Sequence, residues 1–197
     1  MSRERIAAAA IAIADAEGFA AVSMRRIAED LGVGTMSLYH YVKTKADLIG
    51  AMDDAFMAEV LVPSLPEGWR AALMAIATRT RDALMRHPWA LYSMLSVAPG
   101  VNAMRHFEQC LEALAETALT SKEKLTLLAT VDDFVFGYAL REAATDKKID
   151  FDFARSQLAT GEYPRLAEVV RKGRVSVVSD RFQFGLRLIL DRVAQSR

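Results

Sequence analysis

The sequence predicts an all-α protein, because helical spacing of apolar residues recurs along nearly its whole length. No stretch alternates polar and apolar residues for long enough to predict a strand. The chain has 197 residues, of which 52% are hydrophobic and 25% are charged. This length and composition are typical of a folded globular protein with a substantial core, arranged as one domain or two small ones.

The first predicted helix runs from Arg3 to Glu17, and Gly18 is expected to end it. Four of its apolar residues share one helical face: Ile6, Ala10, Ile13 and Ala14. The apolar stretch "IAAAAIAIA" is far too short to span a bilayer, so we interpret it as part of this helix.

Two shorter helices follow. Ser23 is placed to cap the second helix, which Gly32 ends, and a third is predicted over Thr35–Tyr41. Ala28 is expected at a close crossing of these two helices, with Leu38 as an apolar anchor of the third. Two short helices joined by a glycine turn and braced by a preceding helix match a helix-turn-helix.

A capping box of Thr44 and Asp47 predicts a fourth helix that ends near Leu61, and Thr120 with Glu123 predicts a second box. The remaining predicted helices are Glu67–His87, Pro88–Leu95, Val101–Leu119, Ser121–Ala144, Tyr163–Lys172 and Ser179–Ala194. The stretch 145–164 is the least regular part of the sequence and is predicted to be a connector. The expected domains are residues 1–47 and residues 48–197.

The residues of the third helix that do not face the core form its outer face. They are Thr35, Met36, Ser37, Tyr39 and His40. Such a helix is about 12 Å long, comparable with the width of the DNA major groove. Arg25, Tyr41 and Lys45 flank it and are long enough to reach phosphates. The alternative is a common helical hairpin whose tyrosines and lysines are only solvated surface.

Lysine plus arginine equals aspartate plus glutamate, at 25 each, so the net charge is zero. Bulk charge therefore gives no sign of a nucleic-acid-binding protein, and any phosphate contact must come from locally placed residues.

The segment "SMRRIAEDLGVGTMSLYHYVKTKADL" resembles the DNA-binding segment of tetracycline-repressor-type (TetR family) transcriptional regulators, and "LGV…SLYHYVKTK" is its specific core. The segments "GWRAAL", "VAPGVNAM", "DDFVFGYALRE" and "RFQFGLRLIL" resemble, more weakly, the tetracycline repressor's own subgroup. The resemblance implies an all-helical homodimer with three N-terminal helices for DNA and a C-terminal body for ligand binding and dimerisation. It implies DNA contacts at Arg25, Thr35, Met36, Ser37, Tyr39, His40, Tyr41 and Lys45.

Two helices of the C-terminal body are apolar on most of their circumference, over 125–140 and 182–193. Each carries a glycine, Gly137 or Gly185, at a cost of about 1 kcal/mol against alanine that a close helix crossing would justify. Pairing these helices with their symmetry mates would form a four-helix interface. The alternative is that both simply form the core of a monomer.

A largely apolar effector pocket is the second expectation for the body. Its candidate lining residues are Trp89, Met94, Met104, Phe107, Phe134 and Tyr138, with Arg141 available for an anionic group. The resemblance adds Ile76 and Cys110, where the subgroup has polar drug contacts. It also places Met94 where the founding member has a magnesium-binding histidine. Because a thioether is a poor ligand for magnesium, we expect no metal and no cofactor. The alternative is that these side chains are ordinary core.

Three functions remain open at this stage. The favoured one is a ligand-responsive repressor that binds a palindromic operator as a homodimer and releases it with a small molecule. A constitutive DNA-binding or interaction protein without an effector is the second. An enzyme is the third, but Cys110 and His106 lack an orienting third group, so no catalytic residue is predicted. Cys110 is the only cysteine, which fits a reducing compartment, and we expect a cytoplasmic protein without membrane partners.

Overall fold

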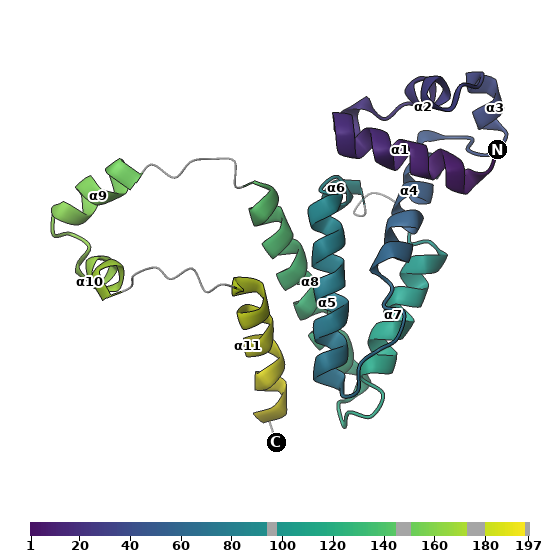
Figure 1. Ribbon diagram of the computed structural model, residues 1–197. Coiled ribbons are helices and arrows are strands. Elements are labelled where there is room, and N and C mark those ends of the chain that lie inside the picture. Colours follow the sequence, from purple (N-terminus) through teal and green to yellow (C-terminus); the bar gives the residue numbers. More distant parts are fainter. Residues whose placement is uncertain (94–97, 145–150, 173–179, 196–197) are drawn as a thin grey trace. The chain divides into compact units, whose positions relative to one another are not determined.

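The structure is a computed structural model that describes residues 1–197 except 94–97, 145–150, 173–179 and 196–197 (Figure 1). Within the described residues every regular element is a helix, which confirms the predicted all-α class. The chain forms two compact units, Met1–Ala143 and Ala144–Arg197.

The first helix, α1 (Arg3–Glu17), has the predicted bounds and the predicted buried face. The hydroxyl of Ser2 caps it by accepting a hydrogen bond from the backbone N–H of Arg5 at 3.3 Å. Gly18 ends it with a φ of 88°, which a residue with a side chain rarely adopts. A 3₁₀ turn, η1 (Phe19–Ala21), leads into the second helix.

The second and third helices, α2 (Met24–Leu31) and α3 (Thr35–Tyr39), pack on each other, and α2 also packs on α1. Ser23 caps α2 as predicted, because its hydroxyl accepts a hydrogen bond from the backbone N–H of Arg26 at 3.2 Å. The third helix ends two residues earlier than predicted, at Tyr39.

The helix α4 (Lys45–Val60) runs from this N-terminal part into the body and contacts α1, α5, α6 and α7 (Figure 1). The body of this unit contains α5 (Trp69–Arg86), α6 (Ala90–Ser93), α7 (Val101–Ala113) and α8 (Ser121–Ala143). α5 packs against α4, α7 and α8, so it is the central helix of the body. Predicted helix ends in the body differ most for α7, which stops at Ala113.

The helix α8 buries one face, formed by Leu127, Leu128, Val131, Val135 and Ala139. Its apolar residues Leu125 and Leu140 are exposed, so the single chain covers only part of this helix. The predicted capping box at its start is confirmed: Thr120 N–H donates to the Glu123 carboxylate at 2.7 Å.

The second unit contains α9 (Phe151–Ala159), α10 (Pro164–Lys172) and α11 (Arg181–Gln195). The prediction of an irregular connector is wrong for α9. Among the side chains of α9 that the structure describes, Phe153 is exposed and Leu158 only partly buried, so they form no buried apolar stripe that a periodic pattern could reveal. Along α11, Phe182, Leu186 and Leu190 are buried at a spacing of four residues.

Across the parts of the chain that the structure describes, every helix is too short or too polar to cross a bilayer.

Candidate nucleic-acid interface and ligand site

The turn between α2 and α3 is built on Gly32. Its φ of 65° lies in the left-handed region that glycine adopts without strain. The backbone N–H of Val33 donates to the carbonyl of Ala28 at 3.0 Å, which closes the end of α2. Ala28 itself is buried, as expected for a residue at the crossing of two helices. The turn therefore fixes α3 at an angle to α2, the arrangement of a helix-turn-helix.

Two opposite faces distinguish α3 and the residues just after it. Leu38 and Val42 are 0% exposed and anchor the segment in the core. Met36 is 75% exposed, Tyr39 42% and Tyr41 44%. Large apolar and aromatic side chains that remain exposed beside fully buried anchors indicate a surface that another molecule covers.

The other predicted DNA-contacting residues lie on the same N-terminal part. Arg25, Ser37, His40 and Lys45 are exposed and Thr35 is partly buried. The guanidinium of Arg25 donates to the Glu29 carboxylate at 2.9 Å, one turn along α2. The structure thus brings together hydroxyls, a thioether, an imidazole and cations around one short helix.

The N-terminus of α4 is occupied by its own capping box. The Asp47 carboxylate accepts hydrogen bonds from the backbone N–H groups of Lys43 and Thr44, at 3.2 and 3.0 Å. The Thr44 hydroxyl accepts one from Asp47 N–H at 3.0 Å. The carboxyl group's own hydrogen bonds, from the Thr44 side chain first and from the backbone N–H groups of Thr44 and Lys43, lower the pKa of Asp47. Any phosphate contact at this helix end must therefore come mainly from the Lys45 ammonium.

A polar junction joins α1 to the start of α6. The Asp15 carboxylate accepts a hydrogen bond from the indole N–H of Trp89 at 2.8 Å, and Nδ1 of His87 lies 2.9 Å from the same carboxylate. The other ring nitrogen of His87 lies 3.3 Å from the Glu59 carboxylate of α4. The Trp89 ring stacks on Phe19 with centroids 6.1 Å apart. Trp89, a candidate for the ligand pocket, therefore has its indole N–H and ring in contact with Asp15 and Phe19 at this junction.

Two neighbouring aspartates tie α4 to the elements that follow α5. The buried Asp53 accepts a hydrogen bond from the Ser93 hydroxyl of α6 at 2.6 Å, and burial raises the pKa of Asp53. Asp54 accepts one from the backbone N–H of Asn102, at the start of α7, at 2.8 Å. The helix that follows the helix-turn-helix is thus bonded directly to α6 and α7.

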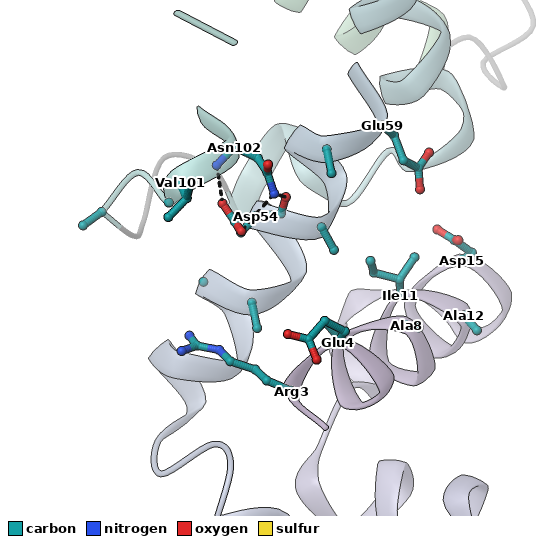
Figure 2. Close-up of a pocket in the computed structure, with 17 residues that line it drawn as sticks. Arg3, Glu4, Ala8, Ile11, Ala12, Asp15, Asp54, Glu59, Val101 and Asn102 are labelled. Carbon is teal, nitrogen blue, oxygen red and sulfur yellow. Dashed lines mark hydrogen bonds between the residues drawn. The ribbon is translucent and has the colours of Figure 1, made fainter. Parts of the chain in front are cut away.

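A groove of about 750 Å³ lies between α1, α4 and the start of α7 (Figure 2). Its walls are mostly alanine and glycine, with Ile11 and Val101 as the larger apolar residues. Figure 2 shows the Asp54–Asn102 hydrogen bonds at one side and Arg3 and Glu4 of α1 at the other. Small side chains therefore leave open space beside the helix that links the helix-turn-helix to the body.

The predicted ligand-binding residues of the body that the structure describes differ in their exposure. Ile76 and Cys110 are buried, whereas Met104, Phe107 and Arg141 are exposed in the single chain. Phe134 and Tyr138 are partly buried neighbours on α8, with ring centroids 6.2 Å apart. Met94 lies outside the described residues.

His106 and Cys110 of α7 form a partly buried polar cluster with Asp132 of α8, and of these three residues only Cys110 was predicted to belong to a site. Nε2 of His106 lies 3.7 Å from Sγ of Cys110. Burial, with the charge of Asp132 as a second cause, raises the pKa of the Cys110 thiol to about 12, so the thiol stays protonated near neutral pH. Burial and the neighbouring Asp133 raise the pKa of Asp132 to about 6, although this side chain keeps much of its surface in solvent. The spacing of four between His106 and Cys110 was the available sequence signal.

This chemistry does not suit nucleophilic catalysis, because the thiolate and not the thiol is the reactive form of cysteine. In the described part of the chain, histidine, cysteine and acidic side chains form no group of three or more that could hold a metal ion.

Comparison with known protein families identifies the class of protein that this fold and site define. The model of the bacterial regulatory proteins of the tetR family matches residues 6–52, and that of the tetracyclin repressor-like C-terminal domain matches residues 62–196. The chain therefore belongs to the tetR family. It is a helix-turn-helix regulator of transcription and not an enzyme. Members of the family act as dimers.

Among individual proteins, the chain is similar to the HTH-type transcriptional repressor DrrR1 of Streptomyces coeruleorubidus. The two are 37% identical over 207 residues, covering 97% of this chain and 76% of the relative. It is 26% identical to the class A tetracycline repressor from transposon 1721 of Escherichia coli, over 96% of this chain and 88% of the relative. The crystal structure of Streptomyces coelicolor ActR in complex with actinorhodin matches with a TM-score of 0.81 and 26% identity, over 98% of this chain and 95% of that chain.

Proposed function

We propose that the protein represses transcription by binding a palindromic operator as a homodimer, with α3 of each copy in the major groove. The observation that supports this most is the exposure of Met36 and Tyr39 beside the fully buried anchors Leu38 and Val42. Two recognition helices about 34 Å apart, one turn of DNA, would read two half-sites of the palindrome. As a DNA-binding regulator, it would act in the cytoplasm.

In this proposal the contacts divide between bases and phosphates. Ser37, His40 and Met36 would contact base edges and thymine methyl groups, because these side chains are short enough to lie inside the groove. Tyr39, Tyr41, Arg25 and Lys45 would contact phosphates and fix the orientation of α3. Thr35, which is partly buried at the start of α3, would contact the DNA backbone.

Tyr39→Ala tests this assignment directly. We expect the variant to lose operator binding in a gel-shift assay while it remains a folded dimer by circular dichroism and light scattering. Tyr92→Ala is the matched control, because Tyr92 is also an exposed tyrosine but lies on α6. Full-strength operator binding by Tyr39→Ala would show that α3 is not the recognition helix.

The body would bind a small, largely apolar effector that favours a second conformation with lower operator affinity. Candidate contacts are Ile76, Met104, Phe107, Cys110, Phe134, Tyr138 and Arg141. ActR, which has the same fold, was crystallised with the small molecule actinorhodin, and this supports a ligand site in the body. A ligand shifts the equilibrium only as far as its affinities for the two states differ. α4 is the natural link, since it contacts α1 as well as α6 and α7.

A regulator without an effector is the alternative. Screening small molecules for release of operator DNA separates the two, because a constitutive repressor stays bound under every condition that leaves it folded. The replacement of the subgroup's polar drug contacts by Ile76 and Cys110 argues against a magnesium–tetracycline complex as the effector.

A further inference from the structure

The strongest unexplained feature of the body is one nitrogen of His106. Its Nδ1 atom is buried and has no hydrogen-bond partner among the described residues, while Nε2 lies 3.7 Å from the Cys110 sulfur. The great majority of buried polar side-chain atoms in folded proteins have a partner, which is often an ordered water or a ligand. The Nδ1 atom of His106 is therefore available for a hydrogen bond to a molecule outside the chain.

The position of His106 is compatible with a ligand. α7 and α8 both pack against α5 but make little direct contact with each other. Phe107 follows His106 on α7, about 100° further around the helix, and exposes apolar surface, whereas Met104 lies on the opposite side of the helix. A bound molecule could therefore bury apolar surface against α7 and reach the imidazole at the same time.

The charges around His106 restrict the kind of ligand. Burial lowers the pKa of His106, so the ring is neutral at neutral pH, and the Cys110 thiol is neutral too. Asp132 is close enough to Cys110 for its charge to raise the pKa of the thiol, and Asp133 is its neighbour. An anionic group would meet these two carboxylates and no charged imidazole, so a carboxylate ligand is disfavoured.

A hydroxyl group satisfies Nδ1 in both forms of the neutral ring. If Nδ1 carries the proton, the hydroxyl oxygen accepts a hydrogen bond from Nδ1–H. If Nε2 carries the proton, the hydroxyl donates a hydrogen bond to Nδ1. A ketone or ether can only accept, and an ammonium can only donate.

We propose that His106 is the polar anchor of the effector site and that the effector is a neutral, largely apolar molecule with a hydroxyl group that bonds Nδ1. This inference rests on the proposed function, in which an effector binds the body. It adds the residue that would orient the effector and the chemical class that the site would select.

The test uses 1-naphthol as the probe, with naphthalene and 1-naphthoate as matched molecules that lack the hydroxyl or carry a charge. The full-length protein has three histidines, so ¹⁵N NMR of the imidazole nitrogens gives few signals, and the signals missing in His106→Gln assign those of His106. We expect 1-naphthol to shift the Nδ1 signal of His106. Naphthalene and 1-naphthoate are expected to leave it in place.

Variants then give the size of the effect. His106→Leu is expected to weaken 1-naphthol binding about tenfold, the loss of one hydrogen bond in a buried site. His106→Gln, which keeps donor and acceptor atoms, is expected to retain most of the affinity. Glu108→Gln, at an exposed position of the same helix, is the control for a substitution on α7 away from the imidazole.

An unchanged Nδ1 signal at saturating 1-naphthol, or equal affinities of His106→Leu and the wild type, would overturn the inference and leave an ordered water as the partner of Nδ1. The proposed function is tested separately by gel shift. If 1-naphthol binds at His106 but the operator stays bound, the site is correct and effector release by this class of molecule is wrong.

Discussion

At the residue scale, Arg25, a proposed phosphate contact, is already paired within its own helix. Its guanidinium bonds the Glu29 carboxylate one turn along α2, and its side chain is 86% exposed. Exposed ion pairs of this kind contribute little to stability, because solvent screens the attraction and both side chains lose freedom. Arg25 can therefore exchange Glu29 for a phosphate at small cost.

Arg25→Ala should weaken operator binding and also make it less dependent on salt. Each phosphate contact releases counterions and adds about 0.9 to the magnitude of the slope of log K against log salt concentration. Loss of the Arg25 contact should therefore reduce this magnitude by about 0.9 for each subunit of the dimer. Fluorescence anisotropy measures the binding constant between about 50 and 200 mM salt, a range wide enough to resolve a change in slope of about 0.9. Arg81→Ala on α5 is the control; an unchanged slope in Arg25→Ala would remove Arg25 from the phosphate contacts.

Single residues also show where sequence reasoning succeeds and where it stops. The exposure of Met36 and Tyr39 was predictable, because the buried anchor Leu38 lies between them and fixes the face that points inward. The role of Trp89 was not predictable. Its partner Asp15 lies 74 positions earlier in the chain, and a contact at that separation leaves no local pattern.

At the scale of elements, the contact between α1 and the start of α6 depends on one carboxylate. Asp15 accepts the hydrogen bond of Trp89 and lies 2.9 Å from Nδ1 of His87, which in turn faces Glu59 of α4. The junction therefore joins three helical segments through one histidine and one tryptophan. Because α1 braces the helix-turn-helix, this junction would transmit movement of the body to α3.

Asp15→Ala should lower the free energy of unfolding by about 1–3 kcal/mol, because it leaves the polar hydrogens of two buried side chains without their acceptor. Chemical denaturation followed by circular dichroism measures the change. Asp30→Ala removes an acid from an exposed pair with Arg26 at 3.8 Å and should change stability by less than about 0.5 kcal/mol. Equal effects of the two substitutions would mean that the junction contributes nothing specific.

Alanines occupy two different environments around α1. Ala28 is buried where α2 turns into α3, whereas Ala55 of α4 lines the groove of about 750 Å³ (Figure 2). Ala28→Leu should therefore cost about 1–3 kcal/mol of stability and weaken operator binding, because the added atoms force the helices apart. Ala55→Leu should change stability by less than about 1 kcal/mol, since the groove accepts the larger side chain. Thermal unfolding and gel shifts of both variants compare their stability and operator binding. A larger loss in Ala55→Leu than in Ala28→Leu would contradict the prediction.

The elements themselves were predicted with uneven success, and the reason is physical. The helix starts at Ser23, Thr44 and Thr120 were correct, because a cap is a local hydrogen bond between residues close in sequence. The helix α9 was missed because its described side chains, Asp152 to Ala159, form no buried apolar stripe. The cluster of His106, Cys110 and Asp132 was only partly predictable: the spacing of His106 and Cys110 lies within one helix, but Asp132 comes from another helix.

At the scale of the whole molecule, regulation requires that a change in the body reach two recognition helices at once. Within the first unit, α4 is bonded to α6 through Asp53 and to α7 through Asp54, and it continues to the capping box beside α3. The groove beside α4 leaves space for this helix to shift against α1. A dimer would convert such a shift into a new distance between the two recognition helices, and thereby a mismatch with the operator.

This mechanism of regulation also requires a dimer, and exposed apolar residues indicate which surfaces of the subunit form the interface. Phe184 and Leu188 of α11 are 53% and 56% exposed and lie one helical turn apart, and Leu125 and Leu140 of α8 are exposed as well. Apolar side chains in such a row are typical of an interface between copies, since water contact is unfavourable for each of them. The predicted four-helix interface of α8, α11 and their symmetry mates would cover them.

Leu188→Arg should convert the dimer to a monomer, because a charge would be buried in the apolar interface. The monomer would hold only one recognition helix and should bind the palindromic operator at least about a hundredfold more weakly, since a second linked contact adds two or more orders of magnitude. Light scattering gives the oligomeric state, and gel shift gives the affinity. Val101→Arg is the control, because Val101 is equally exposed but lies at the start of α7, beside the α1–α4 groove. A dimeric Leu188→Arg protein would place the interface on another surface.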